Sequence, residues 1–449
     1  MKSAGPKASN LGGSLLLVFF FAQALSAQEC LLEANEYTNE AATQIQNARG
    51  MEEEAERVPY YQRALELLEQ AIAESPDDPA ALWLFGEVYV GLGDYVAADS
   101  ILNRLLEVAP ACEERAEQTR HSGWVHSYNE GLQAFAAGDV TRALAAFQKA
   151  NLVKQDARSY NNVGYIYHQQ GETEKAIEAY RISQEVATEA EPRRAATINL
   201  AELLTSVQRV GEALEMYEDY TASYPDDAFA RINYAVLLAQ AGERERSAEL
   251  FNELTQREDY TFEEWNELGV GLLRVGAFGE AIPAFKRARE LQPFNKYVMA
   301  NLVDAQIEAK LFAEALPLAD TLVKWYPYAG AQYPPLANCL SRTGEAGEAL
   351  VYLQLRQGLP FEFEGVNLTE RSGGRYVVRG QVVGRGGSVG ERIAVPFEFL
   401  GSTGDVVASG DLEFLVPPAD VTRTIQLEIE SETPIAGFRY SRAESEGPG

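Results

Sequence analysis

The sequence predicts a mainly α-helical solenoid followed by a small all-β sandwich domain. Two observations lead to this fold class. Between about residues 30 and 357, apolar residues recur at three- and four-residue spacing, as amphipathic helices require, and the helical stretches repeat along the chain. After Gln357 the apolar spacing changes to alternation, and glycine and valine become frequent, which is typical of half-buried strands.

The first residues resemble a secretory signal. Two lysines precede an apolar run from Leu15 to Ala22, which is too short to span a bilayer, and small residues follow up to Ala27. We therefore expect residues 1–27 to be a signal peptide that is cleaved after Ala27. This predicts secretion across the inner membrane, with the periplasm as the destination. The alternative is a membrane anchor.

The helical region is built from repeats. The stretch WNELGVGLLRVGAFGEAIPAFKRARELQP (265–293) has Trp, Leu, Gly, Gly, Ala, Phe, Ala and Pro at offsets 0, 3, 4, 11, 16, 20, 23 and 28. Units of this kind are separated by four intervals of 34 residues, with starts at 194, 228, 262, 296 and 330. The earlier starts at 79, 124 and 157 are followed by intervals of 45, 33 and 37, which indicates insertions.

This pattern resembles the tetratricopeptide repeat (TPR) family. The resemblance implies about nine helix pairs over residues 28–357, stacked as a right-handed superhelix in which each pair covers the apolar face of its neighbour. Small residues at the eighth and twentieth positions of a unit let its two helices approach closely. Glycine near the fifteenth position ends the first helix in a left-handed conformation. The unit that starts at 296 has Lys310 at this turn.

In this family, the first helix of each unit lines a concave groove. At the sixth position of that helix, five units carry asparagine, whereas the unit at 262 carries Glu267. The five residues are Asn129, Asn162, Asn199, Asn233 and Asn301. An asparagine side chain both donates and accepts hydrogen bonds, so a row of them resembles the arrangement with which some TPR proteins hold an extended peptide backbone. The alternative is that these amides bond neighbouring helices.

The charge balance limits the class of partner. Acidic residues outnumber basic ones by 67 to 38, so we expect no nucleic-acid partner, because phosphate binding requires a basic surface. A clamp for an acidic C-terminal tail would need more groove cations than Arg158 and Arg274. Aromatic residues of the groove, together with its acidic residues Glu202, Asp304 and Glu308, favour a protein or peptide partner that is extended and not acidic. These aromatic residues are Tyr128, Phe135, Tyr165 and Phe229.

Catalytic, metal and cofactor motifs are not found in the sequence. The three histidines lack a metal-ligand spacing, and there is no CxxC motif. The glycine-rich stretch GRGGSVG (384–390) is not followed by the lysine and helix that a phosphate loop needs. Ser388 has no histidine within the β domain with which to form a triad. We therefore predict a non-catalytic protein with no metal and no small-molecule cofactor.

The cysteines are consistent with export. Cys30 and Cys112 lie near the first repeats and can form a disulfide in an oxidising compartment. Cys339 lies within the apolar stretch LANCL and is expected to be a buried, free thiol.

The C-terminal region is expected to form an immunoglobulin-like β-sandwich over residues 358–445, followed by a disordered tail at 446–449. Alternation is clearest at 393–399 and 425–429, and we expect six or seven strands. Since proline cannot donate to a β-ladder, the strand that contains Pro396 is expected at a sheet edge.

Together these features predict a non-catalytic scaffold or adaptor of the bacterial cell envelope that binds an extended peptide in the TPR groove. The alternative is a surface- or carbohydrate-binding protein in which the β-sandwich binds and the solenoid is a stalk. A row of exposed aromatic side chains on one sheet would favour this alternative. The candidates are Phe361, Phe363, Phe397 and Phe438.

Overall fold

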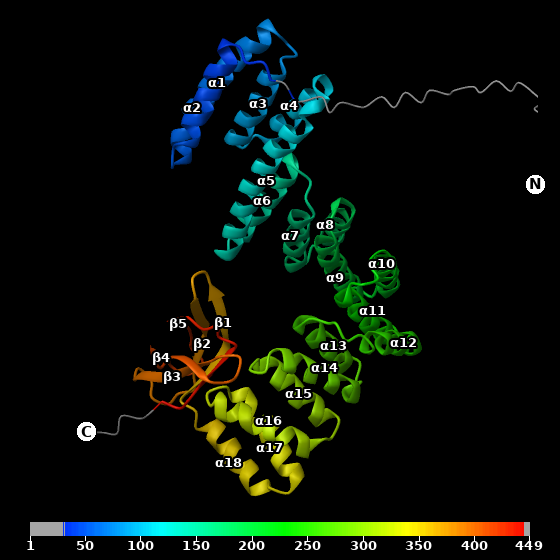
Figure 1. The fold of residues 1–449 in the computed structure, drawn as a ribbon, viewed down its shortest axis with the longest axis vertical. Helices are drawn as coiled ribbons and strands as arrows, with labels where there is room; N and C mark the ends of the chain where they lie inside the picture. Colours follow the sequence, from blue (N-terminus) through cyan, green and yellow to red (C-terminus); the bar gives the residue numbers. More distant parts are fainter. Residues whose placement is uncertain (1–29, 31, 444–449) are drawn as a thin grey trace, which may run out of the picture. The chain divides into compact units, whose positions relative to one another are not determined.

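The computed structural model describes Cys30 and residues 32–443, which form two compact units (Figure 1). Unit 1 extends to Thr188, and unit 2 begins at Glu189. The expected signal peptide (1–27) and C-terminal tail (446–449) lie outside the described residues.

The described part of unit 1 consists of four consecutive helix pairs (Figure 1). Its elements are α1 (Glu36–Arg49), α2 (Glu54–Glu74), α3 (Pro79–Leu92), α4 (Tyr95–Val108), the 3₁₀ helix η1 (Pro110–Cys112), α5 (Glu113–Ala136), α6 (Val140–Val153), α7 (Ala157–Gln169) and α8 (Thr173–Val186).

The described part of unit 2 contains five more helix pairs and a domain of strands (Figure 1). The helices are α9 (Ala190–Ser206), α10 (Val210–Ser223), α11 (Ala228–Gln240), α12 (Arg244–Thr255), α13 (Phe262–Arg274), α14 (Phe278–Leu291), α15 (Lys296–Glu308), α16 (Phe312–Trp325), the 3₁₀ helix η2 (Gly330–Gln332), α17 (Tyr333–Thr343) and α18 (Ala346–Gln357). The strands are β1 (Phe361–Arg371), β2 (Arg375–Gly384), β3 (Arg392–Leu400), β4 (Val406–Leu415), β5 (Thr422–Glu430) and β6 (Gly437–Tyr440).

Helix starts test the predicted repeat spacing. Helices α3, α7, α11, α13 and α15 begin at the predicted positions 79, 157, 228, 262 and 296. Helix α9 begins four residues before the predicted 194, and α17 begins three residues after the predicted 330, behind η2. Helix α5 differs most, because it begins at Glu113 instead of 124.

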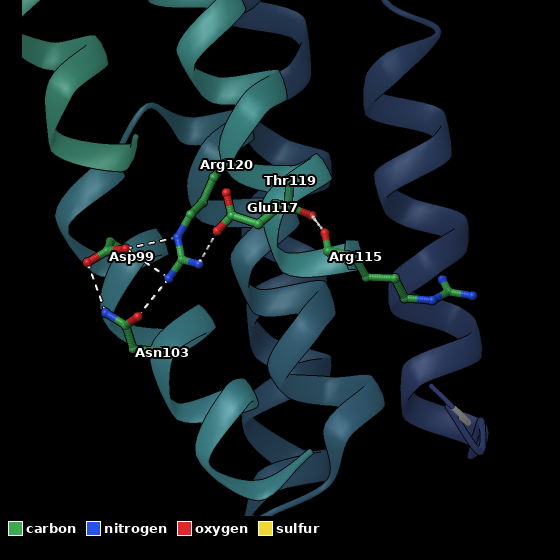
Figure 2. Close-up of polar contacts among 6 residues, drawn as sticks. All are labelled: Asp99, Asn103, Arg115, Glu117, Thr119 and Arg120. Carbon is green, nitrogen blue, oxygen red and sulfur yellow. Dashed lines mark hydrogen bonds and ion pairs between the residues drawn. The ribbon is translucent and has the colours of Figure 1, made fainter. Parts of the chain in front are cut away.

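The early start of α5 is held by a buried cation. The first turns, EERAEQTRHSG, are polar, so no apolar pattern reveals them. Arg120 is only 7% exposed. Its guanidinium donates to Asp99 (3.0 Å) and Asn103 (2.7 Å) of α4 and to Glu117 (2.8 Å) of α5, as Figure 2 shows. A buried charge is tolerated when its partners satisfy it in this way.

Close packing within a pair depends on glycine. A Cβ atom built at Gly164 would lie 2.7 Å from the ring of Tyr180, and one built at Gly269 would lie 2.6 Å from the ring of Phe285. Both rings are fully buried. Each ring comes sixteen residues after its glycine and occupies the space that a side chain would need. The predicted small residue at the eighth position therefore has a clear packing role.

The turn inside each pair from α3/α4 to α17/α18 contains one residue with positive φ. Glycine occupies six of these turns, whereas Gln208 (φ 64°) and Lys310 (φ 63°) occupy the other two. The six glycines are Gly93, Gly138, Gly171, Gly242, Gly276 and Gly344. A non-glycine residue in this conformation costs about 1–2 kcal/mol.

A disulfide fixes the segment before α1 onto unit 1. Cys30 and Cys112 are bonded, with a sequence separation of 82 residues. Leu32 packs with buried leucines of α3 and α4. Asn35 caps α1, and its Nδ2 atom also donates to Asp78 at the start of α3 (2.9 Å). The segment is therefore attached by covalent, apolar and polar contacts together.

The strands form two antiparallel three-stranded sheets, with the orders β1-β2-β5 and β4-β3-β6. The prediction that the Pro396 strand lies at an edge is wrong, because β3 is the central strand of its sheet. Its partner β6 pairs only with Phe397–Leu400 and ends at Tyr440. On that side the carbonyl of Pro396 accepts from the N–H of Ser441 (3.1 Å), and the missing N–H faces the point where β6 has ended.

The turn between α16 and η2 closes the open side of the two sheets. The carbonyl of Tyr328 accepts a hydrogen bond from the N–H of Phe363 in β1 (2.8 Å). The hydroxyl of Tyr326 donates to the carbonyl of Phe438 in β6 (2.7 Å). Buried apolar side chains from α11 to β6 belong to a single cluster. The last repeats and the β domain therefore share one core.

The four phenylalanines proposed for a binding surface on the β domain are buried instead. Phe361 and Phe397 are fully buried, and Phe363 and Phe438 are nearly so. Phe361 stacks on Tyr328 of the helical region with 4.3 Å between ring centroids. The expected row of exposed aromatic residues is therefore not formed by these side chains. Phe361, Phe363 and Phe438 contact Tyr326 or Tyr328 of the helical region, and Phe397 packs among the strands.

Candidate functional site

The predicted groove residues fall into two groups. Asn129 and Asn162 lie on α5 and α7 of unit 1, together with Tyr128, Phe135 and Tyr165. Asn199, Asn233 and Asn301 lie on α9, α11 and α15 of unit 2, together with Phe229. All of them are on the first helix of a pair, and the two groups have different surroundings.

An exposed aromatic surface is the main feature of the first group. Phe135 and Tyr165 are 41% and 42% exposed, and their rings meet edge to face with centroids 5.9 Å apart. Leu132 on α5 is also exposed, and Asn129 lies one helical turn before it. We call Asn129, Leu132, Phe135, Asn162 and Tyr165 the unit 1 face. Exposed apolar side chains next to amides offer both contact area and hydrogen-bonding groups.

Tyr128 supports this face rather than forming its surface. It is half-buried, stacks on Trp124 with 4.7 Å between centroids, and packs against Phe147 at 5.5 Å. Its hydroxyl accepts a hydrogen bond from Nδ2 of Asn162 (3.3 Å). One donor of Asn162 is therefore used to link α7 to α5, and its Oδ1 atom has no protein partner among the described residues.

In unit 2 the asparagines make more internal contacts. Nδ2 of Asn233 donates to the carbonyl of Phe229 one turn earlier (2.9 Å). Nδ2 of Asn301 lies 3.4 Å from Oδ1 of Asn266 on the preceding first helix. Asn199 is half-buried on α9. Asn233 therefore bonds within its own helix, and Asn301 bonds a neighbouring first helix.

Phe229 is covered by a cation. The guanidinium of Arg194 lies 5.1 Å from the centre of the Phe229 ring, and Arg194 is also ion-paired with Asp227 (3.5 Å). The ring is half-buried. Phe229 therefore offers less free aromatic surface than the aromatic residues of the unit 1 face.

A small pocket lies beside Asn233. It has a volume of about 290 Å³ and is lined by residues of α9, α10, α11 and the end of α13. We call it the groove pocket. Glu202, Tyr217 and Arg274 line it. The pKa of Tyr217 is raised by burial and, secondly, by the charge of Glu202, so this hydroxyl stays neutral and is available as a hydrogen-bond donor.

A second pocket lies where α15 meets β1. It has a volume of about 340 Å³, and we call it the junction pocket. Lys296 lines it and donates from Nζ to the carbonyl of Val366. Nζ also lies over the rings of Tyr297 (4.8 Å) and Phe438 (5.6 Å). Burial lowers the pKa of Lys296 to about 8.

The described residues form neither a metal-binding cluster nor a membrane-spanning helix. Within residues 32–443 and Cys30, no group of three or more histidine, cysteine, aspartate or glutamate side chains is arranged to hold a metal ion. Over the same residues, no helix combines the length and apolar character needed to cross a bilayer. His121, the first of the three histidines, stacks on Trp124 with 5.6 Å between centroids.

Comparison with protein families identifies the repeats. Models described as tetratricopeptide repeat match residues 61–118, residues 155–226, and residues 198–260 and 266–333. The chain contains tetratricopeptide repeats. The predicted fold class is confirmed: the described residues form a solenoid of eighteen helices followed by six antiparallel strands in two small sheets. TPR repeats point to a protein–protein interaction scaffold, and proteins of this kind are generally not enzymes.

Individual relatives cover parts of the chain. Tetratricopeptide repeat protein 29 of Trypanosoma brucei brucei (strain 927/4 GUTat10.1) is 27% identical over 166 residues, which are 36% of this chain. The chain spans about a third of the length of this relative, since the match covers 34% of it. TPR proteins in general bind protein or peptide partners.

Solved structures with a similar fold include TPR proteins of low sequence identity. A tetratricopeptide repeat protein from Parabacteroides merdae ATCC 43184 is 14% identical, with a TM-score of 0.37, and the match covers 52% of this chain and 92% of that one. YrrB, described as a TPR protein with an unusual peptide-binding site, is 18% identical, with a TM-score of 0.27, and the match covers 39% of this chain and 89% of that one.

Several surface residues were not predicted from the sequence. Leu132 belongs to the unit 1 face and Asn266 bonds Asn301, although neither is at the sixth position of its unit. Their positions around the helix could have identified them from the sequence. Leu132 follows Asn129 by three residues, and Asn266 directly precedes Glu267, so both lie near the predicted stripe.

Proposed function

We propose that the protein is a non-catalytic scaffold that binds an extended peptide segment of a partner protein on the unit 1 face. The observation that carries this proposal is the exposed pair of Phe135 and Tyr165 on neighbouring first helices. Aromatic side chains supply much contact area at low cost in side-chain entropy. Asn129 and Asn162 border the pair and supply donors and acceptors for a peptide backbone.

The proposed peptide is extended and not acidic. Neighbouring first helices present equivalent positions side by side, so a ligand that crosses them has to be a continuous strand or coil. The protein carries a formal net charge of −29, which repels acidic segments. The same net charge would repel nucleic acid, so we propose no nucleic-acid partner. We also propose no small-molecule cofactor, because the binding of a peptide requires none.

We further propose that the protein acts in the bacterial cell envelope after export to the periplasm. The disulfide between Cys30 and Cys112 supports an oxidising compartment. The expected cleavage after Ala27 predicts a mature chain that begins at Gln28, two residues before the disulfide. N-terminal sequencing of the protein recovered from the periplasm tests this, and a chain that still carries residues 1–27 would contradict it.

For the β domain we propose an immunoglobulin-like relationship. In the seven-stranded immunoglobulin fold, the first, second, fourth and fifth strands share one sheet, and the third, sixth and seventh share the other. The order β1-β2-β5 and the pairing of β3 with β6 support this relationship, whereas β4 differs because it pairs with β3. A final strand would follow β6 in that fold, and here the turn at Tyr326 and Tyr328 contacts β6 and β1 instead. We propose a structural role for this domain.

Selection from a random peptide library tests the binding proposal. The mature protein is compared with two variants of the unit 1 face, Asn129→Ala with Asn162→Ala and Phe135→Ser with Tyr165→Ser. A matched control, Val96→Ser with Leu152→Ser, removes exposed apolar side chains from the second helices α4 and α6. Circular dichroism checks that all variants are folded.

We expect peptides that bind the native protein and the control to bind each face variant at least about tenfold more weakly, which corresponds to about 1.4 kcal/mol or more. The proposal is wrong if the selected peptides bind both face variants with native affinity. It is also wrong if the control loses binding to the same extent, because the effect would then not be located on α5 and α7.

A further inference from the structure

Helix α18, the last helix of the described array, carries a cluster of exposed apolar side chains. Leu350, Val351 and Leu355 are 62%, 53% and 39% exposed. Gly347 and Gln354 are also exposed, and spacings of three and four residues place all five on one side of the helix. We call these five residues the α18 face. Adjoining exposed apolar side chains of this size indicate a contact surface.

The earlier second helices carry a different pattern. Where α18 has the exposed Leu355, helices α12, α14 and α16 have polar side chains at intervals of 34 residues. These are Glu253, Arg287 and Thr321. Where the same three helices bury an apolar side chain, α18 has the exposed Arg356. The buried residues are Leu254, Ala288 and Leu322. Helix α18 is therefore apolar on a side that the other repeats keep polar, and its face is not simply an unused stacking surface.

Nothing in the described chain covers the α18 face. Its apolar side chains stay exposed although the β domain follows α18 directly. The last residues of the sequence, ESEGPG (444–449), contain no large apolar side chain that could cover it. The exposed residues of α1, at the other end of the array, are all polar. A head-to-tail contact between copies would therefore place apolar side chains on a polar helix, which favours contact between identical faces.

We propose that the α18 face binds the α18 face of a second copy of this chain, as an antiparallel helix pair with two-fold symmetry. A two-fold axis at Val351 brings Gly347 of each copy opposite Leu355 of the other, because both lie four residues from Val351. A Cβ atom built at Gly347 would meet no neighbour within 4 Å, so there is room over this glycine for the leucine side chain. Helices that pack through rows of this four-residue spacing cross at about −50°.

The charges of the last helix pair support this arrangement. Residues 333–357 contain two arginines and two glutamates, so their net charge is zero in a chain with a net charge of −29. Glu348 lies in the first turn of α18 and Arg356 in its last turn, and neither has an ion pair among the described residues. An antiparallel pair places the acidic start of each helix beside the basic end of the other. A parallel pair would place like charges together.

The interface is small, and this determines the expected affinity. One helix from each copy buries less surface than the roughly 800 Å² per partner of a standard stable complex, so we expect a dissociation constant in the micromolar range. The inference does not rest on the proposed function of the unit 1 face, because the two faces share no residue. Failure of one proposal leaves the other unaffected.

Sedimentation velocity of the full mature protein tests the proposal, at concentrations from about 1 μM to about 200 μM. The variants of the α18 face are Val351→Glu and Leu355→Glu. Leu291→Glu is the matched control, because Leu291 is an exposed leucine (54%) of another second helix, α14. Two further variants, Arg356→Glu alone and Arg356→Glu with Glu348→Arg, test the orientation of the two helices. Circular dichroism checks that every variant is folded.

We expect the average sedimentation coefficient of the native protein and of Leu291→Glu to rise with concentration. Both variants of the α18 face should raise the dissociation constant at least tenfold. Arg356→Glu should also weaken the dimer, and the added Glu348→Arg should restore it, because the opposite charges are exchanged between the helix ends.

A native protein that stays monomeric over this range would overturn the proposal, and so would native association of both Val351→Glu and Leu355→Glu. Equal loss in Leu291→Glu would show that the contact is not located on α18. If the double charge variant is as weak as Arg356→Glu, the antiparallel arrangement is wrong. If the native protein stays monomeric but sediments with vesicles of phosphatidylcholine, the face binds a lipid surface and the assignment to a second copy is wrong.

Discussion

The two units attach the segments that flank their repeats in different ways. In unit 1, a short segment before α1 is bonded to the array through Cys30 and Cys112. In unit 2, a whole β domain is attached through a shared apolar core and the hydrogen bonds of Tyr326 and Tyr328. A short segment buries too little apolar surface to stay in place alone, whereas a domain buries enough. The covalent bond is therefore found where burial is smallest.

The difference predicts that reduction destabilises unit 1 and leaves unit 2 unchanged, and this is the largest expected effect. Replacing Cys112 with serine, or reducing the disulfide, should destabilise unit 1 by about 4 kcal/mol, because the bond closes a long loop of the unfolded chain. Hydrogen exchange should accelerate in α1 to α4 and stay unchanged in α13 to α18. Equal acceleration in both units, or none in either, would show that the disulfide does not have this local role.

The second largest expected effect is the loss of the hydrogen bond between Tyr326 and the carbonyl of Phe438. Tyr326→Phe keeps the ring and removes the donor to the carbonyl of Phe438. The buried carbonyl is then unsatisfied, so unit 2 should lose about 1–3 kcal/mol. Tyr297→Phe is the matched control, because its hydroxyl bonds Asn367 in an exposed position. Urea denaturation should separate the two variants, and equal midpoints would contradict the role given to Tyr326.

Lys296 makes the same junction sensitive to pH. Its folded pKa of about 8 is below the usual lysine value, so between about pH 8 and 10 the unfolded state binds more protons than the folded state. The contribution of Lys296 to the free energy of unfolding therefore rises with pH, by about 1 kcal/mol from pH 7 to pH 9. In Lys296→Met the rise should disappear. Urea midpoints at pH 7, 8 and 9 measure this, and parallel curves for both proteins would disprove it.

The smallest effect concerns the left-handed turns, where the units also differ. The turns of α3 to α8 all use glycine, whereas unit 2 has Gln208 and Lys310. Lys310→Gly should stabilise unit 2 by up to about 1 kcal/mol, because glycine adopts positive φ without strain. The reverse change, Gly276→Lys, should destabilise it, and its Cβ would meet no neighbour. Thermal unfolding measures both, and a destabilised Lys310→Gly would refute the strain at this turn.

The sequence was sufficient to predict the repeats because their signal is local. The repeat pattern placed five first helices at the correct residue, three of them within the 34-residue intervals, and the asparagine stripe indicated which helices carry the candidate site. The start of α5 was misplaced because Arg120 replaces the apolar pattern with a polar network. Such a network depends on partners from another helix, which periodicity does not reveal.

Long-range features could not be predicted for a related reason. The hydroxyl of Tyr326 meets a carbonyl 112 residues later, and no pattern within either segment indicates the other. Phe361, Phe363 and Phe438 of the β domain lie in stretches that form strands, but they are covered by Tyr326 and Tyr328 of the helical region, which no pattern in the strands reveals.

The contact of Tyr326 and Tyr328 with β6 and β1 also limits how this protein can change over evolutionary time. Repeat arrays commonly gain and lose whole repeats, since each repeat contacts only its neighbours. A duplication or deletion that separates α16 from the β domain would remove the turn that both sheets need. Changes in array length are therefore expected upstream of α15, and the last two helix pairs and the β domain are expected to be inherited together.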